Sequence, residues 1–290
     1  MGQSANEPLV SILIIGAMKC GTTQVFHTLA AHPEVNASAM KEPNFFVDHA
    51  SGNWSRGADW YRSLFREVSG LRMEASTAYT KDYLDSKTAL RIRSLCPEAK
   101  LIYLIRDPVD RAISHYLHSV TEGRETRPIQ EALLDAKSSY GCLSLYHRQL
   151  TPYLRLFPRG QILIVRAESL WREPESNFSD ILRFLGVANV NLPLSPNRHA
   201  TSDRVTYLKQ FGLSLADRKS WLPEIPSKIA PGKPPGARIL GEMLGLTSEL
   251  RNQVEEYFVN DLRQLHQLHI PRSVGSPEEL ELRSKPRNVM

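Results

Sequence analysis

Cysteine is scarce in this chain: only Cys20, Cys96 and Cys142 occur in 290 residues. An odd number at wide spacing does not form a disulfide framework, and reduced thiols are typical of a cytosolic protein. The histidines are scattered, and neither an H-E-x-x-H nor a C-x-x-C pattern occurs. These absences argue against a disulfide-stapled protein and against the zinc sites that such patterns mark.

Long apolar runs are also lacking. The run Leu9 to Ile15 has the length of one strand, whereas a membrane helix needs about 20 apolar residues. No basic segment precedes a long apolar stretch near the N-terminus, so we expect no signal peptide and no membrane anchor. The expected location is the cytoplasm. Internal repeats and low-complexity tracts are absent.

The charge is modest, with a net charge of +5 and a pI near 9.1. Lys and Arg are dispersed, without a basic run or an aromatic-interleaved stripe, which argues against a nucleic-acid partner and suits a small anionic ligand. The chain is long enough to bury a full core, and no linker interrupts it. We therefore expect a flexible N-terminus at 1–8, one domain at 9–270 and a loose tail at 271–290.

The most informative segment is 12–23. An apolar run ends at a loop that lies between Gly16 and Gly21, and the loop leads into a helical pattern. Glycine permits positive φ and close backbone approach, and N–H groups at a helix start bind anions. Lys19 adds a positive charge to the loop. The pattern predicts a phosphate-binding loop, and a turn with an incidental lysine is the alternative.

This loop differs from the nucleotide-triphosphatase motif G-x-x-x-x-G-K-[ST]. The two glycines have its spacing, and Thr23 occupies its Ser/Thr position. Thr22, however, stands at the lysine position, and Lys19 lies three residues earlier. We expect the loop to hold a phosphate-like group without the usual Lys and Mg²⁺ arrangement.

A second candidate site follows the apolar run 101–105, which is typical of a strand buried on both faces. Arg106 comes directly after it, at the ligand edge of an open parallel sheet. Asp107 fits a helix cap and Pro108 a first helical turn, and Ser114 follows within that helix. Arg106 with Ser114 suits a second phosphate. A structural ion pair of Arg106 is the alternative.

Strands and helices alternate along the chain, which predicts an α/β fold with a doubly wound parallel sheet. The expected strands lie near 10–16, 71–76, 100–105 and 161–166. The expected helices lie near 21–31, 86–95, 108–120, 128–138, 146–157, 175–185, 203–217 and 246–268.

Two stretches break this alternation. Residues 33–70 are irregular and rich in aromatic side chains, which fit either a lid or acceptor wall or a satellite of the core. Residues 190–240 are punctuated by proline, and a loop of this length in a compact domain is usually functional or mobile. We expect both stretches on the acceptor or lid side.

Together these segments resemble the sulfotransferases that use 3′-phosphoadenosine 5′-phosphosulfate (PAPS). Residues 16–23 resemble the 5′-phosphosulfate loop of that family, and 106–114 resemble its 3′-phosphate motif. The similarity is closest to the heparan-sulfate, carbohydrate type, through K-E-x-x-F-F at 41–46, G-x-x-W-Y at 57–61 and E-x-S-x-x-Y at 74–79. It covers about 9–190, with a weaker echo to about 268.

The resemblance implies a P-loop NTPase-like three-layer fold, with a central parallel sheet flanked by helices, and PAPS as the sulfuryl donor. It places the donor-binding residues at Lys19, Cys20, Gly21, Thr22 and Thr23 for the 5′-phosphosulfate, at Arg106 and Ser114 for the 3′-phosphate, and at Arg204 and Lys233 for further phosphate or adenosine contacts. The product would be 3′-phosphoadenosine 5′-phosphate (PAP).

Sulfuryl transfer needs a base for the acceptor proton and a cation for the leaving phosphate. By resemblance Glu42 falls on the proposed general base, while Lys19 fits the cation. His118 falls on a histidine near the reacting centre in some members. The alternatives are that Glu42 is a surface carboxylate at a turn and that His118 orients substrate or packs against Tyr116. No metal is expected to be required, because sulfuryl oxygens carry less charge than phosphoryl oxygens.

The acceptor is left open. Ala75 stands where several heparan-sulfate enzymes have a lysine, which argues against a polyanionic glycan. The missing anchor points to a bacterial-like enzyme or to a catalytic domain cut from a longer protein. The expected reaction is transfer to a hydroxyl or amine of a carbohydrate-like or secondary-metabolite acceptor. An atypical P-loop kinase and a non-catalytic PAP-binding module are the alternatives, and the sequence does not give the oligomeric state.

Overall fold

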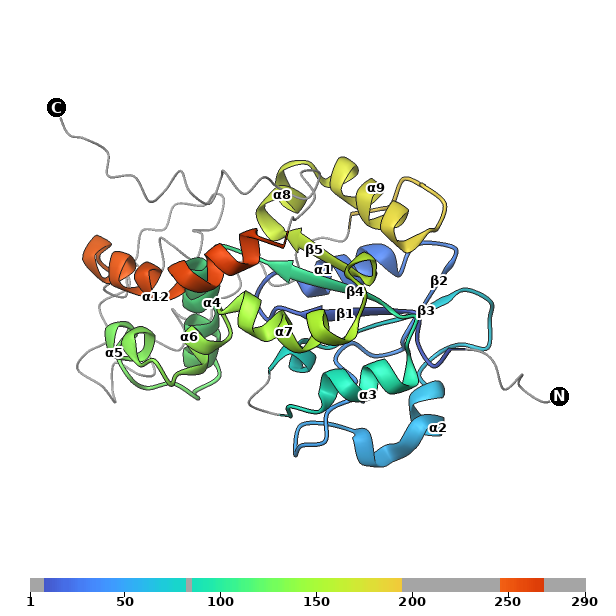
Figure 1. Cartoon of the computed structure of the whole chain (residues 1–290), viewed down its shortest axis with the longest axis horizontal. Helices are drawn as coiled ribbons and strands as arrows, with labels where there is room; N and C mark the ends of the chain where they lie inside the picture. Colours follow the sequence, from blue (N-terminus) through green and yellow to red (C-terminus); the bar gives the residue numbers. More distant parts are fainter. Residues whose placement is uncertain (1–7, 82–84, 195–245, 269–290) are drawn as a thin grey trace. The chain divides into compact units, whose positions relative to one another are not determined.

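The computed structural model describes residues 8–81, 85–194 and 246–268 (Figure 1). The N-terminal segment 1–7, Arg204, Lys233, the predicted helix at 203–217 and the C-terminal tail lie outside the described residues. The described residues divide into two compact units: 8–81, 85–106, 146–194 and 264–268 belong to the first, and 107–145 and 246–263 belong to the second.

The first unit is built on a parallel sheet of five strands in the order β2-β3-β1-β4-β5. The strands are β1 (Ile12–Gly16), β2 (Val35–Ala37), β3 (Leu71–Ala75), β4 (Lys100–Ile105) and β5 (Ile162–Arg166). The predicted α/β class and all four predicted strands are confirmed. The short edge strand β2 was not predicted, because it lies in the stretch 33–70 that we expected to be irregular.

Strand β1 lies at the centre of this sheet. Its residue Ile12 pairs with Met73 of β3 on one side and with Lys100 of β4 on the other. All five residues of β1 are buried. A strand covered on both faces needs apolar side chains at successive positions, which explains the continuous apolar run in the sequence.

Helices cover both faces of the sheet, with α1, α8 and α9 on one face and α3 and α7 on the other (Figure 1). The helices of the first unit are α1 (Thr22–Leu29), α2 (Gly57–Arg62), α3 (Thr88–Leu95), α7 (Tyr146–Leu156), α8 (Ala167–Arg172) and α9 (Pro174–Leu185), with 3₁₀ turns η1 (Trp54–Arg56), η2 (Thr77–Thr80) and η3 (Arg159–Gln161). The predictions of α1, α3, α7 and α9 are confirmed, whereas α2 and α8 were not predicted.

The aromatic side chains of 33–70 pack mainly as a satellite of the core. Phe45, Phe46, Tyr61 and Phe65 are buried. The Phe45 and Tyr61 rings stack with their centroids 4.3 Å apart, and Phe46 meets Tyr61 edge to face at 5.5 Å. Of the two interpretations of these aromatics, the structure supports core packing.

The described part of the second unit is helical. It contains α4 (Pro108–Thr121), α5 (Ile129–Leu134), α6 (Ser139–Cys142) and most of α12 (Ser248–His266). The apolar faces of α4, α5 and α12 share one core, which includes Val109, Ile113, Tyr116, Leu117, Ile129, Leu250, Val254 and Phe258. The predictions of α4 and α12 are confirmed.

The helix predicted at 128–138 is wrong in its extent. It ends at Leu134, because Asp135 adopts extended backbone angles. The Asp135 carboxylate accepts a hydrogen bond from the Lys137 backbone N–H at 3.0 Å and pairs with Arg127 at 3.0 Å. Aspartate competes with the helix in this way by bonding its own neighbouring backbone, and α6 begins only after that turn.

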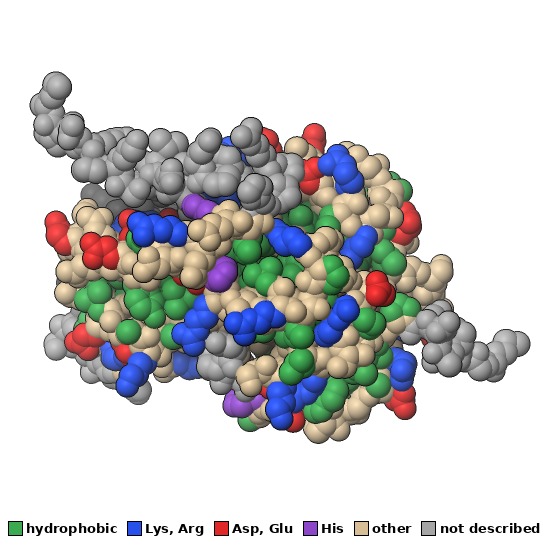
Figure 2. Space-filling view, in the orientation of Figure 1, with side chains coloured by type: hydrophobic (Ala, Val, Ile, Leu, Met, Phe, Trp, Pro, Cys, Tyr) green, Lys and Arg blue, Asp and Glu red, His purple; other side chains and the backbone are tan. Residues whose placement is uncertain are grey.

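Two further observations concern the expectations from composition. None of the described helices has the length and apolar character needed to cross a membrane. All three cysteines lie within the described residues, and none takes part in a disulfide. On the face shown in Figure 2, Lys and Arg side chains are spread among apolar and acidic ones.

Candidate functional site

The loop that follows β1 depends on Gly16. This residue has φ 154°, and a Cβ at this position would meet the Thr80 hydroxyl and lie 2.9 Å from the Tyr103 ring. The Ala17 N–H donates to the carbonyl of Leu104 at 2.8 Å, so the loop starts in contact with the end of β4. Glycine is therefore required for close approach, as predicted, and the approaching groups belong to the protein.

Two features near the end of the loop are typical of an anion site. Lys19 has a left-handed φ of 70°, which is uncommon for a residue with a side chain. Gly21 has φ 89° and precedes α1 as its N-cap, without a side-chain cap. Thr22 is buried and Thr23 is half-buried at the first turn. An uncapped helix start presents its first N–H groups to a ligand.

Tyr146 joins this loop to the end of β4. Its hydroxyl lies 3.7 Å from the Cys20 sulfur and accepts the backbone N–H of Arg106 at 3.4 Å. The Cys20 side chain is buried, so it fills space behind the loop, and any contact of Cys20 with a ligand would have to come from its backbone. The structure thus brings the loop and Arg106 to the carboxyl edge of adjacent strands.

Glu42 lies against the end of β3. Its backbone N–H donates to the Ala75 carbonyl at 2.8 Å. One carboxylate oxygen accepts the Thr77 N–H at 2.8 Å and the Thr77 hydroxyl at 3.2 Å, and the other pairs with Lys41. The side chain is 33% exposed. Glu42 thus caps the start of η2 and also keeps an exposed edge beside the sheet.

The backbone around Glu42 is strained. Glu42 has φ 60° and Asn44 has φ 49°. Left-handed backbone at non-glycine residues costs free energy and is concentrated at functional sites. Together with Lys19, these residues are the non-glycine positions of positive φ in the described part of the chain. Two of the three are residues that the sequence assigns to the reaction.

A second carboxylate, Glu74, is fully buried on β3. It accepts hydrogen bonds from the hydroxyls of Tyr79 at 2.5 Å, Ser76 at 2.9 Å and Tyr61 at 3.3 Å. Burial raises the pKa of Glu74 to about 7; the hydroxyl hydrogen bonds lower it, and the nearby charge of Glu42 raises it further. A carboxyl group with a pKa near 7 beside a candidate base deserves a functional explanation.

The second unit carries the two other predicted residues. Ser114 is buried on α4, and His118 lies one turn later on the same helix. The Nε2 of His118 lies 3.1 Å from a carboxylate oxygen of Glu122. An acidic neighbour of this kind orients the imidazole ring.

The start of α4 has the predicted cap. The Asp107 side chain accepts the Asp110 N–H at 2.8 Å, and Pro108 occupies the first turn. Arg251 of α12 pairs with Asp107 at 3.1 Å and with Asp110 at 2.9 Å, and it also pairs with Glu255 at 2.9 Å. These ion pairs fix the helix start that follows Arg106.

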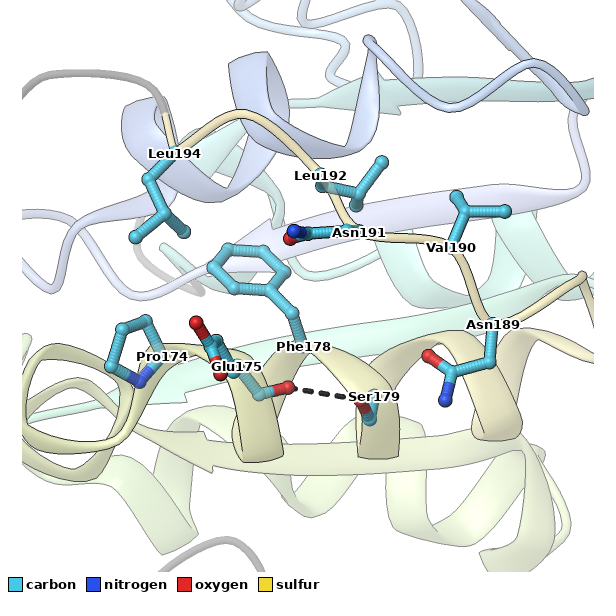
Figure 3. Close-up of a pocket in the computed structure, with 9 residues that line it drawn as sticks. All are labelled: Pro174, Glu175, Phe178, Ser179, Asn189, Val190, Asn191, Leu192 and Leu194. Carbon is cyan, nitrogen blue, oxygen red and sulfur yellow. Dashed lines mark hydrogen bonds between the residues drawn. The ribbon is translucent and has the colours of Figure 1, made fainter.

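A cavity of about 300 Å³ lies elsewhere in the first unit (Figure 3). It is lined by Pro174, Glu175, Phe178 and Ser179 of α9 and by Asn189, Val190, Asn191, Leu192 and Leu194 of the segment that follows. None of the predicted site residues lines it. We therefore do not assign the cavity to the candidate reaction.

The Trp171 ring lies against Gly21, where an added Cβ would come within 2.7 Å of it. Sequence reasoning did not anticipate the roles of Glu74, Tyr146 and Trp171. Glu74 was visible as the first residue of the E-x-S-x-x-Y motif, and a glutamate inside an apolar strand was a usable signal. Tyr146 and Trp171 gave no such signal, because their contacts with the loop join positions more than a hundred residues apart.

The geometry can now be compared with known proteins. A family model for the sulfotransferase domain matches residues 10–211. The chain belongs to the sulfotransferase family. It is 32% identical over 197 residues to heparan sulfate glucosamine 3-O-sulfotransferase 3B1 of Mus musculus, covering 64% of this chain and 48% of the relative. It is 30% identical over 200 residues to bifunctional heparan sulfate N-deacetylase/N-sulfotransferase 2 of Homo sapiens, covering 62% and 22%.

A solved sulfotransferase from Alicyclobacillus acidocaldarius has a similar fold. The TM-score is 0.65 at 25% identity, and the match covers 91% of this chain and 96% of that one. This likeness agrees with the predicted P-loop NTPase-like fold with a central parallel sheet. The chain spans about half the length, or less, of the two curated relatives named above.

Proposed function

We propose that this sulfotransferase moves the sulfuryl group of PAPS to a hydroxyl or amine of a carbohydrate-like or secondary-metabolite acceptor. The observation that carries the proposal is the loop after β1, where Lys19 is left-handed and α1 begins without a side-chain cap. Beside it, at the end of neighbouring β3, lies the partly exposed carboxylate of Glu42.

The donor would be held by the loop and by Arg106. The first N–H groups of α1, the side chain of Lys19 and the hydroxyls of Thr22 and Thr23 suit the 5′-phosphosulfate. Arg106 and Ser114 suit the 3′-phosphate, with planar guanidinium geometry favouring a bidentate contact. Family membership and the similarity of 16–23 and 106–114 to the family motifs support this assignment.

Glu42 would act as the general base. It would take the proton of the acceptor as the acceptor oxygen or nitrogen bonds to sulfur, while the bond from sulfur to the phosphate oxygen breaks in line. Its hydrogen bonds with Thr77 hold one carboxylate oxygen in place. General-base catalysis needs the base within hydrogen-bond reach of that proton, more than it needs a high pKa.

Lys19 would stabilise the charge that builds on the departing phosphate. The described residues contain no cluster of His, Cys, Asp and Glu able to hold a metal ion. Charge stabilisation by Lys19, Arg106 and the N–H groups of α1 is the chemistry that this chain's own residues offer. His118, paired with Glu122, is assigned a substrate-orienting role in this proposal.

A carbohydrate acceptor is supported by the two relatives, whose names give heparan sulfate as their substrate. Ala75 stays the reason to expect an acceptor of lower charge, since this position carries no cation to meet an anionic glycan. The proposed acceptor class is a sugar or sugar-like alcohol or amine.

Calorimetric titration tests the donor assignment. We expect micromolar or tighter binding of PAP to the full chain without metal, and weaker binding of ATP with Mg²⁺. Preference for ATP with Mg²⁺ would support an atypical P-loop kinase instead. Tight PAP binding without any sulfuryl transfer to a panel of sugars would support a non-catalytic nucleotide-binding module.

A further inference from the structure

Glu74 is a buried carboxylate without a cation among its described partners. Its contacts are the hydroxyls of Tyr61, Ser76 and Tyr79. Burying a carboxylate is costly unless its charge is compensated. The hydroxyl partners of Glu74 also contact other groups, and those contacts indicate which part of the fold the buried carboxylate supports.

The Ser76 hydroxyl links Glu74 to the strained turn at 42–44. Its hydroxyl donates to Glu74 at 2.9 Å and accepts the backbone N–H of Asn44 at 3.0 Å. Its own backbone N–H donates to the Ile14 carbonyl of β1 at 3.1 Å. The hydroxyl of Ser76 therefore stands between the buried carboxylate and the turn at 42–44, with its backbone fixed on the sheet.

The turn needs such support. Left-handed backbone at two non-glycine residues costs free energy, and a few hydrogen bonds to β3 and its end oppose that cost. They are the Glu42 N–H to Ala75, the Thr77 contacts with the Glu42 carboxylate, and the Asn44 N–H to Ser76. The last of these is the contact that reaches Glu74.

We propose that Glu74 is a positioning residue, which acts through the Ser76 hydroxyl to fix the left-handed turn that presents Glu42. The inference rests on the proposed function, in which Glu42 is the base. An ionised carboxylate only accepts hydrogen bonds. The Ser76 proton must then point toward Glu74, which leaves a lone pair of the Ser76 oxygen for the Asn44 N–H.

Ionisation of Glu74 supports the same arrangement. The pKa of Glu74 is raised to about 7 by burial, so the carboxylate form dominates above neutrality. The titratable groups that act on it are Glu42 from the turn, Tyr61 from α2, Tyr79 from η2, Tyr153 from α7 and Cys96 after α3. The three tyrosines and Cys96 are neutral near pH 7, because burial raises their pKa values.

Hydrogen exchange of the full chain tests positioning without any need for activity. In E74Q and S76A we expect the amide of Asn44 to exchange at least about tenfold faster than in the wild type, the scale of a lost hydrogen bond to an ordered partner. Y61F is the matched control, since it removes another Glu74 contact that does not lead to the turn. Its Asn44 exchange should stay within about twofold.

Kinetics give the second readout, with PAPS as donor and a glucosamine oligosaccharide as acceptor. E74Q and S76A should lower kcat by about tenfold or more, while PAP affinity by calorimetry stays within about twofold. The kcat of the wild type should rise as pH increases through about 7, the pKa of Glu74. E74Q should lack that rise. If Glu74 only stabilised the fold, E74Q would still show it.

The outcomes separate this inference from the proposed function. Unchanged Asn44 exchange in E74Q would overturn the positioning role of Glu74, whatever the activity and whatever S76A shows. Faster exchange with unaltered kcat and pH profile would overturn it as well. A wild type that binds no PAP and transfers no sulfuryl group would contradict the proposed function, and the exchange rates would still decide whether Glu74 holds the turn.

Discussion

The indole ring of Trp171 lies so close to Gly21 that a Cβ on residue 21 would stand 2.7 Å from Cζ2 of the ring. Gly21 also has φ 89°. A positive φ and a close aromatic ring thus both restrict residue 21, which precedes α1. We predict that Gly21→Ala weakens PAP binding at least about tenfold and lowers stability by about 1–3 kcal/mol, measured by calorimetry and by urea unfolding.

Gly123→Ala is the matched control for this variant. Gly123 has φ 69°, and nothing lies within 4 Å of an added Cβ, so this change adds strain without a clash. Its loss of stability should be the smaller one, and PAP affinity should stay at the wild-type level. Equal losses in the two variants would show that the Trp171 contact does not matter.

The second prediction concerns the candidate base. Glu42→Gln should leave PAP affinity within about twofold and lower kcat by about 10²-fold or more, the scale of a lost general base. The glutamine oxygen can still accept the Thr77 N–H, so the turn should stay in place. Transfer assays with PAPS and a sugar acceptor, combined with calorimetry, provide the measurement.

Thr77→Val is the control for the Glu42 variant. It removes the hydroxyl contact at 3.2 Å and keeps the N–H contact at 2.8 Å. We expect less than about a tenfold decrease in kcat, on the scale of one hydrogen bond. Wild-type turnover in Glu42→Gln would remove Glu42 from the mechanism.

The third prediction is a pH dependence of stability. The pKa of Glu74 is raised from 4.5 to about 7 in the folded protein, so the folded state binds this proton more tightly than the unfolded chain. The contribution of Glu74 therefore favours folding at low pH and is lost as pH rises from 4.5 to about 7. The loss is on the order of 3 kcal/mol.

Glu74→Gln isolates this contribution, because glutamine is neutral at every pH. The free energies of unfolding of the wild type and the variant, measured in urea at pH 5 and pH 8, should diverge in favour of the variant at the higher pH. A difference between the two proteins that is the same at both pH values would contradict a raised pKa for Glu74.

The fourth prediction concerns the helix start after Arg106. Arg251→Met should lower the free energy of unfolding by about 2–4 kcal/mol, since it removes the cation that pairs with the half-buried carboxylates of Asp107 and Asp110. Arg263→Met on the same helix is the control. Arg263 is exposed and makes a 3.3 Å contact with Asn260, so its loss should cost less than about 0.5 kcal/mol. Equal losses in the two variants would show that the ion pairs of Arg251 do not stabilise the helix start.

The sequence was most informative where one local rule dominates. The run 12–15 could be recognised as a buried parallel strand because covering on both faces demands apolar residues throughout. The cap at Asp107 with Pro108 followed from helix chemistry alone, and the structure confirms it.

The sequence was least informative where tertiary contacts determine the local conformation. The hydroxyl of Tyr146 links Cys20 and Arg106 across the fold, and no local pattern encodes that contact. The left-handed φ of Glu42 and Asn44 is equally hidden, because it depends on tertiary hydrogen bonds. The Glu42 N–H donates to Ala75, the Asn44 N–H donates to Ser76, and the Asn53 side chain donates to the Pro43 carbonyl. The early end of α5 depended on the backbone contact of Asp135, which outweighed a helical pattern.

The strand order has a consequence for how this enzyme can diverge. The loop at 16–21, which we propose binds the donor, and Arg106 follow β1 and β4, whereas Glu42 and its turn lie against β3 on the other side of β1. Under the proposed function, the donor contacts and the candidate base thus come from separate stretches of the chain. Substitutions near the end of β3 can therefore change how the candidate base is presented while the loop between β1 and α1 stays as it is.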